Sequence, residues 1–236
     1  MKKLGAFLLG VGLIAGATVA ADSNTATSVN IVGFQKITCS TGQWVLVSAA
    51  FQSVDGTVLK CANVISNQLP KGTSVITYDT TAQAYKSDSK SGFSVDGTWS
   101  DNITFSGGMG FWIYVPSEGL GITTSSYDVV FAGQVPMSLI ASNEVKNGFN
   151  LLGFPYTASV VFSNTSLYKN SVRGDSIVLW KNNSYQSYSK GGFGEAIWPD
   201  DAKALEITPD MGYWYYSSTN PFYNVEACPY TNSLSK

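Results

Sequence analysis

The strongest constraint on the fold is a phrase that the chain contains twice, Met109-Gly110-Phe111-Trp112 and Met211-Gly212-Tyr213-Trp214. Further similar pairs precede it in the same order: Gly72 and Gly174, Ser89-Lys90 and Ser189-Lys190, and Trp99-Ser100-Asp101 and Trp198-Pro199-Asp200. Similarity that keeps its order over such a length indicates a repeated structural unit. The sequence therefore predicts two tandem domains, residues 29–136 and 137–236, each of ordinary domain size.

Within each copy, apolar and aromatic residues alternate along short segments. In Phe111-Trp112-Ile113-Tyr114-Val115, successive side chains belong to opposite faces, as they do in a pleated strand. Two segments, 57–65 and 164–172, instead have the apolar spacing of a short helix. The predicted fold is all-β with a minor helical part: two similar antiparallel β-sandwich or barrel-like domains in tandem, each with one short helix.

The N-terminus predicts export from the cytoplasm. Lys2 and Lys3 precede an apolar run, and the run ends in the small residues of Val19-Ala20-Ala21. This pattern is typical of a secretory signal peptide, here residues 1–21, with residues 22–28 as an N-terminal tail. No later apolar stretch is long enough to cross a bilayer, so we expect no membrane span after cleavage. The expected location is extracellular or at the cell surface.

The composition argues against several kinds of chemistry. The chain has no histidine, which is the commonest general base and metal ligand. Only 13% of its residues are charged, and its formal net charge is −2, which does not favour binding to a phosphate backbone. We therefore expect a protein that is not an enzyme, holds no cofactor or metal, and does not bind nucleic acid.

Three cysteines, Cys39, Cys61 and Cys228, are too few for a cysteine-only zinc site. In an oxidising compartment one disulfide is expected, and the Cys39–Cys61 pair would close a loop of about 22 residues, worth roughly 3 kcal/mol. Cys228 would then remain unpaired. Disulfides from Cys228 to either of the other two cysteines are the open alternatives.

Two tryptophans in polar loops are the candidate ligand-binding residues. Trp99 precedes Asp101, and Trp198 precedes Asp200 at the same spacing. An aromatic face beside a carboxylate can bind a sugar, so these four residues form the predicted sites. The alternative is that each tryptophan covers the end of its own β domain.

A second pair of tryptophans lies in the middle of predicted strands. Trp112 and Trp214 belong to the repeated phrase itself. A mid-strand position favours a core role, and sugar stacking is the alternative. Acidic residues flank Trp99 and Trp198, but no calcium-loop spacing occurs among them.

Several phrases resemble repeats in exported proteins of unknown function from bacteria of the Verrucomicrobia–Planctomycetes group. The resemblance rests on residues 29–34, 109–112 and 148–153. The repeats of that type have a Trp-Asp/Asn-Gly hairpin, which Trp180-Lys181-Asn182-Asn183 fits loosely and Tyr78-Asp79-Thr80-Thr81 does not. The resemblance implies export and β architecture, and it carries no activity or site residue.

The leading functional hypothesis is a non-enzymatic extracellular or cell-surface protein with a structural or interaction role. A short strand-like phrase recurs around Gly33, Gly133 and Cys228. Interchangeable edge strands of this kind favour a self-assembling envelope or filament subunit, whose partners are further copies or other surface proteins. The alternative is a carbohydrate-binding module that takes polysaccharide near Trp99 and Trp198.

Overall fold

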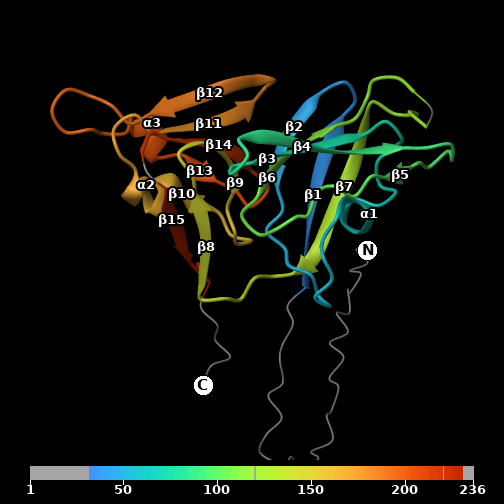
Figure 1. Ribbon diagram of the computed structural model, residues 1–236, viewed down its shortest axis with the longest axis horizontal. Coiled ribbons are helices and arrows are strands. Elements are labelled where there is room, and N and C mark those ends of the chain that lie inside the picture. Colours follow the sequence, from blue (N-terminus) through green and yellow to red (C-terminus); the bar gives the residue numbers. More distant parts are fainter. Residues whose placement is uncertain (1–31, 120, 220, 231–236) are drawn as a thin grey trace, which may run out of the picture.

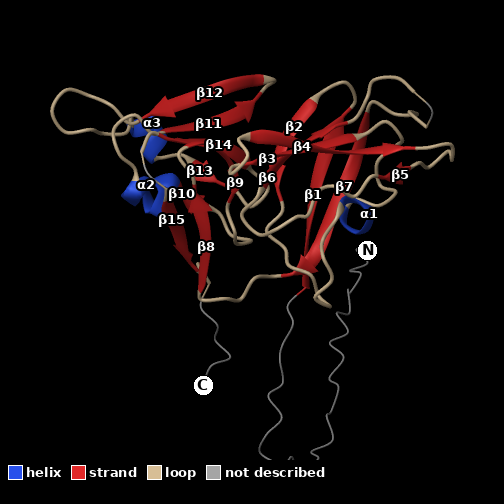
Figure 2. Ribbon diagram, in the orientation of Figure 1, coloured by secondary structure: helices blue, strands red, loops and turns tan. Residues whose placement is uncertain are grey.

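The computed structural model describes residues 32–119, 121–219 and 221–230 (Figure 1). The predicted signal peptide and N-terminal tail lie outside these residues. The described chain is mostly β, with 47% strand and 8% helix in several antiparallel sheets, which confirms the predicted β-rich class (Figure 2). The division into two tandem domains stays a prediction.

Two larger antiparallel sheets form the body of the protein. The first has the order β2 (Trp44–Ser48), β6 (Gly110–Tyr114), β3 (Ser74–Asp79), β4 (Ala84–Ser91) and β5 (Thr98–Trp99). The second has the order β9 (Gly148–Gly153), β14 (Gly212–Ser217), β11 (Ser176–Lys181) and β12 (Ser184–Ser189). Each sheet therefore places the strand that carries the repeated Gly-aromatic-Trp phrase between two neighbours.

Each large sheet lies next to a two-stranded ribbon. One ribbon pairs β1 (Val32–Ser40) with β7 (Ser126–Gln134), and the other pairs β8 (Ile140–Val145) with β15 (Phe222–Ala227). Figure 1 shows the ribbons extending downward from the sheets, joined at their lower ends by the connection from β7 to β8. A small third pair joins β10 (Val160–Val161) to β13 (Glu206–Ile207).

The helices are short and lie at the sides of the sheets. They are α1 (Cys61–Val64), η1 (Phe162–Asn164), α2 (Ser166–Asn170) and α3 (Asp200–Lys203). The helices α1 and α2 fall inside the two segments predicted to be helical, 57–65 and 164–172. The helix α3 was not predicted. It begins directly after Pro199, and its first turn carries Asp200 and Asp201, whose negative charges favour a helix N-terminus.

Apolar side chains gather in three clusters. One fills the space between the first sheet and the β1–β7 ribbon. A second lies between the second sheet and the β8–β15 ribbon. The third lies between the two large sheets and centres on Leu46, Trp112, Leu151 and Trp214. Both faces of β6 and β14 are therefore covered, which makes Trp112 and Trp214 part of the contact between the sheets.

The backbones of the two sheets come very close at two glycines. A Cβ atom on Gly110 would lie 2.5 Å from the Leu152 carbonyl oxygen, and one on Gly212 would lie 2.5 Å from that of Val47. Backbone hydrogen bonds cross at the same places, from Ser48 N to Asp210 O and from Gly153 N to Gly108 O, both 2.9 Å long. Any side chain here would push the sheets apart.

We expect Gly110→Ala and Gly212→Ala each to lower the free energy of unfolding by about 1–3 kcal/mol, the usual cost of overpacking. Denaturant titration measures the loss. Gly191→Ala is the matched control, because a Cβ at Gly191 meets no atom within 4 Å. Equal stability of all three variants would contradict the close approach of the sheets.

Candidate functional site: an aromatic groove between the two sheets

The structure places the predicted Trp198 inside the protein. Its side chain is 1% exposed, and its indole N–H donates to Ser171 Oγ at 2.8 Å. The ring packs edge-on against Phe162, with 5.0 Å between the ring centroids. Asp200 lies on the surface in an ion pair with Lys203 at 2.9 Å, which lowers the pKa of the Asp200 carboxyl. In this arrangement Trp198 offers no face to a ligand.

Trp99 is half-buried and packs against the first core. Its indole N–H donates to the carbonyl oxygen of Ser66 at 2.8 Å. Asp101 accepts the backbone N–H of Ala62 at 3.2 Å, so its carboxylate holds the start of α1. The structure therefore ties Trp99 and Asp101 to neighbouring backbone rather than to an open pocket.

All three cysteines are free thiols, so the predicted Cys39–Cys61 disulfide is absent from this structure. Cys39 and Cys61 are buried in the first core. Burial, and then the nearby Asp128 carboxylate, raise the pKa of the Cys39 thiol to about 11. Burial also raises the pKa of Cys61. Cys228 is only half-buried.

An open aromatic groove lies between the two large sheets. One part, of about 260 Å³, is lined by Trp44, Ile76, Tyr85, Trp112, Trp180 and Tyr185. The other, of about 470 Å³, is lined by Tyr78, Gln83, Tyr85, Phe149, Val178, Tyr185 and Trp214. Because Tyr85 and Tyr185 line both parts, the two parts are adjacent.

The aromatic rings on the two sides of the groove are arranged alike. The Trp112–Trp180 centroids are 5.2 Å apart, and the Tyr78–Trp214 centroids are 5.1 Å apart. Tyr185 approaches Trp112 at 6.3 Å, and Tyr85 approaches Trp214 at 6.2 Å. All four contacts are edge-to-face, the geometry that aromatic quadrupoles prefer. The rings hold one another in place: Trp112 and Trp214 are buried, while Tyr85 and Tyr185 are exposed.

The groove has few polar groups, and none of the described residues that line it is charged. The Trp180 indole N–H donates to the Trp44 carbonyl oxygen at 3.0 Å. Within the described part of the chain, the hydroxyls of Tyr85 and Tyr185 have no hydrogen-bond partner. Both side chains are well exposed, at 65% and 60%. These two hydroxyls are available to a ligand.

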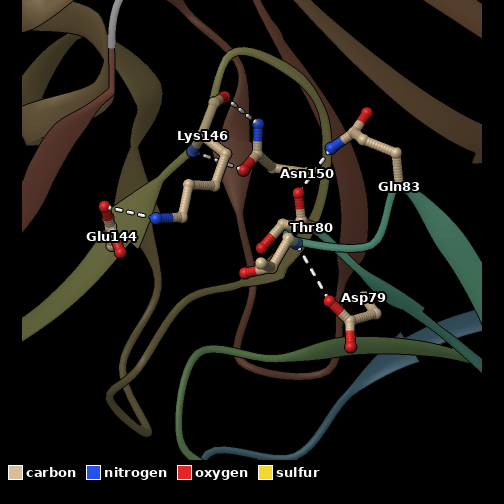
Figure 3. A network of polar contacts seen from close by, with 7 residues as sticks. Asp79, Thr80, Gln83, Glu144, Lys146 and Asn150 are labelled. Atoms are coloured by element: carbon tan, nitrogen blue, oxygen red, sulfur yellow. Dashed lines mark hydrogen bonds and ion pairs between the residues drawn. The ribbon is translucent and has the colours of Figure 1, made fainter.

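A polar network fixes one rim of the groove (Figure 3). Gln83, at the tip of the β3–β4 hairpin, donates to Thr80 O at 2.6 Å. Its side chain lies beside the turn before β9, where a Cβ on Gly148 would be 2.9 Å from Gln83 Oε1. That turn is held by Asn150, which accepts from Lys146 N and donates to Lys146 O, each at 2.8 Å. The hairpin tip and the turn thus lie side by side, each held by its own hydrogen bonds.

Comparison with protein-family models, curated proteins and solved structures found no match to this chain. The resemblance to exported bacterial repeat proteins stays a prediction. None of the described helices is long and apolar enough to cross a bilayer. The described residues also contain no group of three or more Cys, Asp or Glu side chains placed to hold a metal ion.

Because Trp198 is core, we expect Trp198→Ala to lower the free energy of unfolding by about 3–5 kcal/mol, as large-to-small core substitutions do. Thermal or denaturant unfolding measures the change. Phe193→Ala is the control, because Phe193 lies in the same loop region and is fully exposed, and we expect it to stay within about 0.5 kcal/mol of the parent. A Trp198→Ala variant of unchanged stability would restore Trp198 as a ligand-binding candidate.

We expect a thiol reagent at pH 8 to label Cys228 alone in the native protein, because the raised pKa values and burial of Cys39 and Cys61 keep them protonated and covered. In guanidinium all three thiols should react. The Cys228→Ser variant should lose the native signal and keep two thiols after unfolding. Loss of two thiols from the unfolded parent, with Cys228 still labelled in the native protein, would show that the Cys39–Cys61 disulfide forms after all.

Proposed function

We propose that this chain is a non-enzymatic extracellular or cell-surface protein that acts by binding, and that its aromatic groove binds carbohydrate. The observation that carries the proposal is the set of aromatic rings, including Trp44, Tyr85 and Tyr185, that lines an open, uncharged groove. Aromatic faces cover the apolar faces of sugar rings, while a few polar groups orient the hydroxyls.

The size of the groove supports an extended ligand. Its two parts have volumes of about 260 and 470 Å³ and share Tyr85 and Tyr185. Pockets for small organic ligands have volumes of roughly 300–1,000 Å³, so the larger part falls within this range and the smaller part lies just below it. A linear glycan that passes Tyr85 and Tyr185 would occupy both parts. The proposal thus moves the carbohydrate site from Trp99 and Trp198 to the groove.

We also infer that the two halves of the chain are duplicated domains. The strand order β2-β6-β3-β4 in the first sheet has the same connectivity as β9-β14-β11-β12 in the second. The close approach at Gly110 has a counterpart at Gly212. Duplication accounts for a groove whose two sides carry matching aromatic pairs.

Self-assembly remains the second candidate function. The observation that favours it is β12, whose residues are exposed along almost the whole strand. An exposed edge strand can pair with a strand of another chain. Export, which rests on the N-terminal sequence pattern, places either function outside the cytoplasm.

We expect the double variant Tyr85→Ala plus Tyr185→Ala to weaken binding to a soluble polysaccharide by about 5- to 140-fold, since each lost stacking contact costs roughly 0.5–1.5 kcal/mol. Affinity electrophoresis against β-1,4-glucan, β-1,3-glucan and α-glucan measures it. The matched control is Phe93→Ala plus Phe193→Ala, which removes two fully exposed aromatic rings outside the groove. Absence of binding by the parent, or equal binding by both double variants, would refute the proposal.

A further inference from the structure

None of the described strands pairs with the outer edge of β12. The strand ends the second sheet, with β11 as its neighbour there. Lys190 N donates to Asp175 O at 2.8 Å, so this pair is hydrogen-bonded across the two strands. Hydrogen-bonded and non-hydrogen-bonded pairs alternate along an antiparallel ladder. The N–H and C=O groups of Tyr185, Ser187 and Ser189 therefore point away from β11.

The corresponding edge in the first sheet is covered. On β4, Ser89 exchanges two contacts with Ser100: Ser100 N donates to Ser89 O, and Ser89 N donates to Ser100 Oγ, both at 3.2 Å. The side-chain amide of Asn102 also donates to Ser87 O at 3.5 Å. β5 pairs with the end of β4 at Lys90 and Ser91. Each outward-facing position near the end of β4 thus has a partner.

A proline removes this cover from β12. In the repeat, Pro199 occupies the place of Ser100, and proline has neither an N–H nor a hydroxyl to offer. The chain then turns directly into α3 instead of running along the strand. In the described part of the chain, no residue bonds to the outward backbone groups of Ser187 and Ser189.

The composition of β12 does not protect this edge. Natural edge strands are commonly guarded by lysines or other charges, which resist pairing with another strand. β4 carries the exposed Lys86, in an ion pair with Asp79 at 2.7 Å. β12 reads Ser-Tyr-Gln-Ser-Tyr-Ser and has no charged residue. An uncharged edge faces no electrostatic repulsion from an identical strand.

We propose that β12 pairs antiparallel with β12 of a second copy of this chain. A twofold axis perpendicular to the sheet at Ser187 sets Ser187 opposite Ser187 of the second copy and Tyr185 opposite its Ser189. Pairing of the three outward-facing residues forms on the order of six backbone hydrogen bonds. The two four-stranded sheets become one continuous sheet. Because each copy uses its single β12 edge, assembly closes at a dimer and does not grow into a filament.

The test is the mass of the chain lacking residues 1–21, measured by sedimentation velocity over a range of concentrations. The parent should show the mass of two chains, and Ser187→Pro should show the mass of one. The proline removes only an outward N–H, so pairing with β11 is preserved. Near-ultraviolet circular dichroism checks that the variant is folded. Ser187→Ala should remain a dimer, because it keeps the backbone N–H.

Ser87→Pro is the matched control on β4, where Ser87 also faces away from the neighbouring strand β3. It should leave the dimer intact. A parent that is monomeric at every concentration, a parent that forms open polymers, or a folded Ser187→Pro that stays dimeric would each overturn the proposal. The outcome is independent of the carbohydrate proposal, since the mass is measured without glycan and Tyr85 and Tyr185 are unchanged.

Discussion

The architecture depends on the contact between the two large sheets. At Gly110 and Gly212 the sheets approach until backbone meets backbone, with room for no Cβ atom. Beyond these points the large side chains of Trp112 and Trp214 stand between the sheets and keep them apart. The groove is the physical consequence, because surfaces that touch at a pair of glycines and are spaced by indoles elsewhere cannot close completely.

Much of the fold follows from local sequence pattern. The alternation in Phe111-Trp112-Ile113 gives the strand and assigns Trp112 to the face opposite Phe111. The same pattern does not say what covers that face. A ribbon of the same half covers the Phe111 side, while a sheet from the other half covers the Trp112 side. Such long-range pairing depends on tertiary packing, so the groove was not foreseen, although its aromatic residues are visible in the repeated phrases.

The surroundings of the predicted site residues also depend on tertiary packing that local sequence pattern does not specify. Trp99 and Trp198 lie in loops with polar neighbours, a setting that allows either a ligand-binding ring or one that covers the end of its domain. In the structure, each indole N–H finds an oxygen on a nearby segment, Ser66 O or Ser171 Oγ, and the ring fills the end of its core. A buried indole needs such a partner, and the sequence does not reveal where it comes from. The sequence allows both a ligand-binding role and an end-covering role, and the burial of Trp198 agrees with the end-covering one.

Small differences between two similar halves determine what their surfaces can do. Lys90, in β4, and Lys190, directly after β12, each anchor the end of the second strand of a hairpin, with the ammonium groups donating to Leu69 O at 2.8 Å and to Ser171 O at 2.7 Å. The two halves then differ at one equivalent position, where Ser100 bonds to Ser89 in the first half and Pro199 stands in the second. The side chain of Tyr185 faces the groove, while its backbone groups lie along the sheet edge. Because side chains and ladder hydrogen bonds point in perpendicular directions, one strand can serve a groove and an edge without competition.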